Sequence, residues 1–107
     1  MNKSIQNEVV ESMVNNLMIV LVSEHTDQDP LDIGLEADVL VPVLKAKADI
    51  KDWKEAIDEA WDEAYDNVVC GNDEYWREEY GLLGEEVEAV IRAKSDQIVK
   101  QALSLLK

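Results

Sequence analysis

The stretch DIKDWKEAIDEAWDEAYDNVVCG, residues 49–71, decides the fold. At about 100° per residue, its apolar side chains fall inside one arc and its acidic side chains inside the opposite arc. The pattern predicts an amphipathic helix from about Ile50 to Val69, with Asp49 as N-cap and Gly71 as a left-handed C-cap. The residues expected to face the core are Ile50, Trp53, Ile57, Ala60, Trp61, Ala64 and Val68.

Apolar residues keep helical spacing on both sides of this stretch. Ahead of it they predict a helix from about Ile5 to Ser23, with Ser4 as its N-cap. Behind it they predict one helix from Glu85 to about Leu106, whose last turns are apolar on more than one side. That wide apolar face is expected to be covered by other helices or by a second copy of the chain.

Turn residues mark shorter helices between the long ones. Asp29–Pro30 combines a capping acid with proline at the first helical position, and Gly34 is expected to end this turn. A further short helix, Asp73–Tyr80, is predicted between Asn72 as N-cap and Gly81 as the terminating residue.

Two apolar runs fit either a helix or a short strand. Leu17–Val22 is apolar on every side and rich in β-branched residues. In Val39–Leu44, Pro42 favours a helix that starts near Asp38, because proline cannot donate a hydrogen bond to a strand ladder. The expected fold class is all-α: a single domain over residues 1–107, built as a helical bundle of three long helices plus short connecting helices.

Composition excludes several classes of function. The chain has 107 residues, with 24 Asp and Glu against 10 Lys and Arg, and a formal net charge of −14. This charge argues against direct binding to nucleic acid or to an anionic membrane. Hydrophobic residues make up 47% of the chain, too many for a disordered acidic tail. A single cysteine, no signal sequence at Met1–Ser4 and no apolar run of about 20 residues together predict a cytoplasmic protein.

Three isolated features are interpreted as structural only. His25 has no second His or Cys nearby to share a metal, and is expected to be exposed in a loop. Asp27-Gln-Asp29 is similar to the start of a calcium loop, but Asp32 stands where that loop needs glycine. Cys70 has no basic neighbour to stabilise a thiolate, and is expected to pack at a helix end. The sequence therefore predicts no catalytic residue, no metal site and no cofactor.

Negative charge is concentrated in residues 49–88, which hold 15 Asp and Glu but only Lys51, Lys54 and Arg77. Like charges recur there at helical spacing, although mixed signs would stabilise an exposed helix better. From Asp49 to Asp66, eight acids over about 27 Å give roughly one per 3.4 Å, the spacing of phosphates along one DNA strand. The candidate partner-binding residues are Asp52, Glu55, Glu59, Asp62, Glu63, Asp66, Asp73, Glu74, Tyr75, Glu78 and Glu79.

Residues 52–64 resemble the acidic helix of the Ocr-type phage antirestriction proteins, which mimic DNA. The nearly neutral, Leu-rich C-terminal helix departs from the acidic C-terminus of that family. The resemblance implies a phage-type inhibitor of a restriction, CRISPR or related nucleic-acid-handling enzyme. The similar positions are Asp52, Ala56, Ile57, Ala60, Asp62 and Ala64.

A second resemblance involves the pairs Glu63-x-x-Asp66 and Glu85-x-x-Glu88. They are similar to the paired ExxE and ExxD helices of the MazG-type all-α nucleotide pyrophosphohydrolases. In that family the acids converge on a metal inside the bundle, so the resemblance implies a Mg²⁺-dependent enzyme. Here Glu63 and Asp66 are predicted to point to water, on the face opposite the tryptophans.

The leading hypothesis is an acidic protein without chemistry of its own. Its partner would be a basic nucleic-acid-binding protein whose groove it occupies by charge mimicry of DNA or RNA. One alternative is an immunity or antitoxin protein for a basic nuclease toxin, with Tyr75 and Trp76 as anchors. The second alternative is the pyrophosphohydrolase, and the third is a helical structural or adaptor protein whose charge serves only solubility. A homodimer through the C-terminal helix is a further possibility raised by its wide apolar face.

Overall fold

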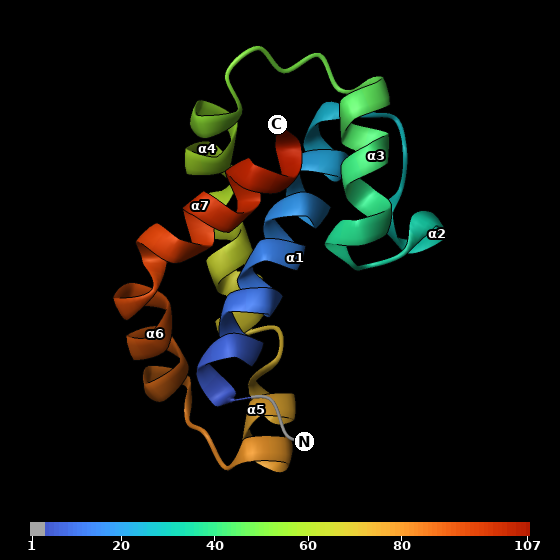
Figure 1. Cartoon of the computed structure of the whole chain (residues 1–107). Coiled ribbons are helices and arrows are strands. Elements are labelled where there is room, and N and C mark those ends of the chain that lie inside the picture. The colour runs from blue at the N-terminus through green and yellow to red at the C-terminus, as the bar shows by residue number, and fades with distance from the viewer. Residues whose placement is uncertain (1–3) are drawn as a thin grey trace.

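Helices α1 (Ile5–His25) and α4 (Trp53–Val69) pack along each other at the centre of the computed structural model, which describes residues 4–107 (Figure 1). The region Leu17–Val22 is helical, which excludes the strand alternative, and nearly all of it is buried. It can be apolar on every side because α3, α4, α6 and α7 all contact α1. The apolar arc of α4 lies in the same core, with Ile57 and Ala64 completely buried.

Five shorter helices complete the described part of the chain, which contains no strand. The all-α class is therefore confirmed. Within residues 4–107, no helix is both long enough and apolar enough to cross a bilayer. Residues 1–3, to which part of the signal-sequence interpretation applies, lie outside the described residues. The five helices are α2 (Pro30–Ile33), α3 (Ala37–Lys47), α5 (Asp73–Tyr80), α6 (Gly84–Ala93) and α7 (Ser95–Leu106).

Side-chain caps start two helices as predicted. The Ser4 hydroxyl accepts a hydrogen bond from the Asn7 N–H at 3.1 Å, and the Asp29 carboxylate accepts one from the Leu31 N–H at 3.0 Å. Each bond satisfies a donor that the first turn of a helix cannot pair internally. The run Val39–Leu44 is helical, with Pro42 inside α3.

Helix α1 extends two residues beyond its predicted end. Thr26 closes it, because its N–H and its hydroxyl both donate to the Val22 carbonyl, at 3.1 and 2.7 Å. His25 is therefore a half-buried residue of the last helical turn. The prediction of an exposed loop histidine was wrong.

The N-terminal end of α4 lies three residues later than predicted. Asp52, and not Asp49, is the cap, since its carboxylate accepts a hydrogen bond from the Glu55 N–H at 3.2 Å. Both aspartates precede the apolar pattern at a plausible distance, so periodicity alone could not choose between them. Residues 48–52 instead form the connection from α3 to α4 at the top of Figure 1.

The C-terminal end of α4 closes without the predicted left-handed glycine. Gly71 does not have a positive φ; the N–H groups of Cys70 and Gly71 both donate to the Asp66 carbonyl, at 2.9 and 3.1 Å. A Cβ on Gly71 would lie 2.5 Å from the Asn67 carbonyl oxygen, so glycine is needed here for close backbone approach. Cys70 is exposed, which contradicts its predicted packing as a small apolar residue at the helix end.

The predicted C-terminal helix is divided at Lys94, so only two of the three long helices exist as predicted. Lys94 has φ −110° and ψ 11°, and α7 leaves α6 at this point. The Ser95 hydroxyl donates to the Arg92 carbonyl at 3.2 Å, a local bond that competes with helix continuation. The break lets α6 and α7 both follow the surface of α1 (Figure 1).

The tryptophans are buried differently from the prediction. Trp53 and Trp61 pack against the core but are only half-buried, since Trp53 lies in the first turn of α4 and Trp61 at the edge of its buried arc. Trp76 of α5 is 1% exposed, and its indole N–H donates to the Val68 carbonyl at 2.8 Å. The main aromatic anchor of the core is therefore Trp76.

Candidate functional site

The acidic side chains of α4 line one exposed face of the helix. They recur three or four residues apart, so they form a continuous line along the helix axis. The sequence predicted that they would point to water, but it left Asp58 out of the candidate set. We call this surface the α4 acidic stripe; its members, all exposed, are Asp52, Glu55, Asp58, Glu59, Asp62, Glu63 and Asp66.

Within the described residues, one member of the α4 acidic stripe, Asp58, forms an ion pair with a neighbour. The Lys54 ammonium lies 2.7 Å from the Asp58 carboxylate, four residues further along the helix. Among residues 4–107, the other six carboxylates form no ion pair. Like charges at this spacing destabilise a helix by a few tenths of a kcal/mol per pair. The α4 acidic stripe therefore lowers the stability of the helix that bears it.

The charge density of the stripe remains close to that of DNA when the observed helix start is used. From Asp52 to Asp66 the axial length is about 21 Å at 1.5 Å per residue. Seven acids less the charge of Lys54 give one net negative charge per roughly 3.5 Å. One strand of duplex DNA carries a phosphate about every 3.4 Å. A basic groove that binds nucleic acid would attract a surface of this kind.

Asp52 has a structural role as well as a place in the stripe. Its carboxylate is held by the Glu55 N–H at the start of α4. Replacing an N-cap aspartate costs about 1 kcal/mol of stability. Asp52 is therefore a poor position for testing charge alone, and the acids from Glu59 to Asp66 are better suited.

Helix α5 carries the second group of candidate residues. Trp76 fixes this helix to the end of α4 and Tyr80 packs against the core, whereas the other side chains of α5 are exposed. Arg77 approaches Asp73 at 3.8 Å, and the other three acids form no ion pair within the described chain. Gly81 closes the helix with φ 67°, as predicted, whereas the Asn72 side chain makes no capping bond. The exposed candidates on α5 are Asp73, Glu74, Tyr75, Glu78 and Glu79.

Tyr75 is the one aromatic side chain of α5 that is largely accessible, at 42% exposed. Its ring packs edge-on against Trp76 and Tyr80, with centroid distances of 5.2 and 6.1 Å. Its hydroxyl donates to the Glu8 carboxylate at 3.2 Å. The hydrogen bond with Tyr80, desolvation and Glu8 raise the pKa of Tyr75 to about 12, so its hydroxyl stays protonated at neutral pH.

The pairs that suggested a metal-dependent enzyme do not form a metal centre in residues 4–107, where no group of three His, Cys, Asp or Glu side chains is arranged to hold a cation. Glu63, Asp66 and Glu85 are exposed. Glu88 is half-buried beside Tyr65, where desolvation and the neighbouring carboxylate raise the pKa of Tyr65.

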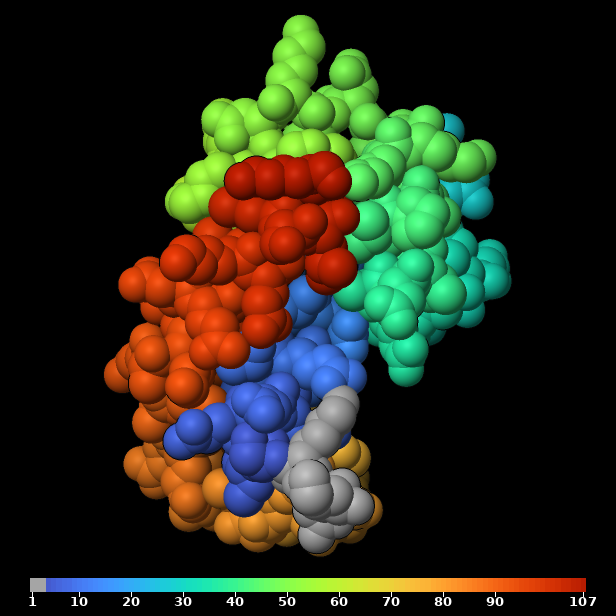
Figure 2. Space-filling view, viewed as in Figure 1, coloured from blue at the N-terminus to red at the C-terminus, as the bar shows by residue number. Residues whose placement is uncertain are grey.

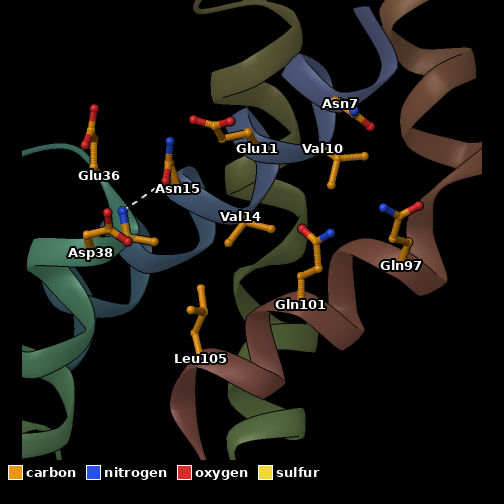
Figure 3. A pocket seen from close by; sticks show the side chains of 11 residues that line it. Asn7, Val10, Glu11, Val14, Asn15, Glu36, Asp38, Gln97, Gln101 and Leu105 are labelled. Atoms are coloured by element: carbon orange, nitrogen blue, oxygen red, sulfur yellow. Dashed lines mark hydrogen bonds between the residues drawn. The ribbon is translucent and has the colours of Figure 1, made fainter. Parts of the chain in front are cut away.

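A groove that the sequence did not predict lies where α1, α3 and α7 meet, with a volume of about 390 Å³. Figure 2 shows α7 and α3 lying against each other over α1 on this side of the molecule. Asn15 of α1 connects α1 to the start of α3 beside the groove, because its side-chain oxygen accepts a hydrogen bond from the Ala37 N–H at 2.9 Å (Figure 3).

The chemistry of this groove does not suit an anionic substrate. Gln97 and Gln101 extend from α7 into it. On the other side, Glu36, which directly precedes α3, and Asp38 of α3 add negative charge (Figure 3). Among residues 4–107, no Lys, Arg, His or Cys lines it. The carboxylates of Glu36 and Asp38 would repel the phosphates of a nucleoside triphosphate, which argues against a nucleotide site here.

Comparison with protein family models, with curated proteins and with solved structures found no match to this chain. Its function therefore has to be inferred from the charge and geometry of its own residues. The α4 acidic stripe and the exposed residues of α5 are the surfaces with the most distinctive chemistry.

Proposed function

We propose that this chain is an acidic binding protein that occupies the nucleic-acid-binding surface of a basic protein. The carboxylates of the α4 acidic stripe would take the places of phosphates in the partner's groove. The observation that carries the proposal is a line of exposed acids on helix α4, six of which form no ion pair within residues 4–107. Their spacing of roughly one net charge per 3.5 Å suits cationic side chains that bind a phosphate backbone.

A solubility role accounts for this arrangement less well. Solubility needs net charge on the surface, but it does not need like charges to follow one another along a single helix. Glu–Lys pairs four residues apart would give a soluble and more stable helix. In the part of the chain that the structure describes, Lys54 and Asp58 form such a pair, and the other stripe acids form none.

The class of partner follows from the chemistry of the stripe. A complementary surface must present several Lys or Arg side chains in a line, as the grooves of nucleic-acid-handling enzymes do. Together with the resemblance of residues 52–64 to Ocr-type proteins, this favours a phage-type inhibitor of a restriction, CRISPR or related enzyme. The acids of α5 would extend the contact beyond the end of α4.

One observation keeps the immunity-protein alternative in consideration. Tyr75 is exposed among the acids of α5, and tyrosine is enriched at protein interfaces. Trp76 cannot serve as the second anchor, because it is buried in the core. If the partner is a nuclease toxin, replacing Tyr75 with alanine should weaken binding about as much as reversing charges on α4.

Salt dependence is the first test of the proposal. We expect the immobilised chain to capture a basic protein from nuclease-treated lysate at 0.1 M salt and to release it at 1 M. Over that range the Debye length falls from about 10 Å to about 3 Å, so attraction between exposed charges is largely screened. Bound protein is measured by quantitative mass spectrometry at each salt concentration.

A matrix carrying a neutral protein of similar size serves as the control for non-specific capture. Retention that is equally strong at both salt concentrations would contradict the proposal, because it would indicate a mainly apolar interface. Nuclease treatment matters, since residual nucleic acid would itself occupy the basic surfaces that the chain is expected to bind.

A further inference from the structure

The groove between α4 and α7 is apolar and electrically neutral, unlike the acidic surface of the rest of the molecule. Trp61 of α4 and Val99 and Leu103 of α7 form its floor, and its volume is about 600 Å³. All three side chains pack against the core but remain only half-buried. Covering apolar surface of this kind is favourable by about 25 cal/mol per Å².

The charges around this groove balance. Lys54 and Asp58 stand on the α4 side, paired at 2.7 Å, and Asp96 and Lys100 stand on the α7 side. The lining residues therefore carry no net charge in a chain whose total is −14. Residues 89–107 as a whole hold four basic side chains and one acid, so this end of the molecule is the least repulsive to another acidic protein.

We infer that the α4–α7 groove is the interface through which two copies of this chain form a twofold-symmetric dimer. A basic partner would be drawn instead to the α4 acidic stripe, where the attraction is far stronger. A second copy meets like charge over most of its surface but a neutral, apolar surface here. This inference does not depend on the proposed function.

In a twofold-symmetric dimer, the opposite charges of Asp96 and Lys100 on α7 can pair across the interface. In an antiparallel pair of α7 helices with the axis near Val99, Asp96 of one copy lies within about one helical turn of Lys100 of the other. The symmetry repeats this contact, so the dimer gains two opposite-charge pairs at the edges of a core formed by Val99, Leu103 and Trp61. Both charged residues are exposed in the single chain and available for the contact.

The test is the oligomeric state of the purified full-length chain, measured by light scattering and sedimentation from micromolar to submillimolar concentration. We expect a concentration-dependent mass that approaches twice the chain mass of 12.1 kDa. Lys100→Asp should raise the dimer dissociation constant at least about tenfold, because it places like charges opposite each other twice. The double exchange Asp96→Lys/Lys100→Asp should restore dimerisation.

Lys47→Asp is the matched control. Lys47 is also exposed and lies outside the groove, and its replacement changes the net charge by the same amount. Circular dichroism checks that each variant remains helical. A wild-type chain of 12.1 kDa at every concentration would overturn the inference. So would equal weakening by Lys47→Asp and Lys100→Asp, or a double exchange that fails to restore the dimer.

Discussion

Replacing Trp76 with alanine is expected to lower the free energy of unfolding by about 4 kcal/mol, as for other fully buried large aromatics. The side chain is 1% exposed and joins α5 to the core. Its loss would also remove the donor of the 2.8 Å bond to the Val68 carbonyl, which lies in the last turn of α4. Urea or thermal unfolding followed by circular dichroism measures the change.

The matched control for this change is Trp61→Ala. It removes the same side chain from a half-buried position at the edge of the α4 arc, so we expect a loss of about 1–2 kcal/mol. Both unfolding experiments are carried out at low protein concentration, where self-association does not contribute to the free energy of unfolding. If Trp76→Ala destabilises the chain no more than Trp61→Ala, α5 is not anchored as described.

Reversing the charges of Glu59, Asp62, Glu63 and Asp66 to lysine is expected to reduce partner binding at least about a hundredfold. The attraction between stripe and groove becomes repulsion at four neighbouring positions, and like charges brought together cost several kcal/mol. The helix itself should tolerate the change. All four side chains are exposed, and lysines near the C-terminal end of α4 interact favourably with its dipole.

A second quadruple variant distinguishes the effect of the α4 acidic stripe from the effect of the total net charge. Glu24, Asp27, Asp32 and Asp38 are also exposed acids, but they lie on α1, α2, α3 and the connection between α1 and α2. Reversing them gives the same net charge as reversing the stripe. Binding by this control should fall much less. If both variants lose binding equally, total charge rather than the α4 acidic stripe drives the interaction.

Most of the helices could be predicted from the sequence, because apolar spacing within each helix and turn residues beside it indicate where it lies. The end of α5 follows from the left-handed Gly81, and the exposure of the α4 acids follows from the opposite apolar arc. These features depend on neighbours within a few residues. They can therefore be inferred from the order of residues alone.

The features that the sequence did not predict depend on contacts between distant segments. Trp76 became the main anchor because α5 folds back onto the end of α4, while Trp61 lies at an edge that no other helix covers fully. The break at Lys94 falls where the apolar stripe has a gap, between Ile91 and Ile98, but one polar turn is also compatible with a continuous helix, so periodicity did not predict it. The groove beside Asn15 needs three helices to form.

Competition for the partner tests the central proposal most directly. Once the captured protein is purified, it is saturated with a fluorescent DNA or RNA duplex that it binds, and the chain is titrated in at 0.1 M salt. Charge mimicry predicts complete release of the duplex, with a midpoint that rises in proportion to duplex concentration. A ternary complex that holds the partner, the duplex and the chain together would contradict the account.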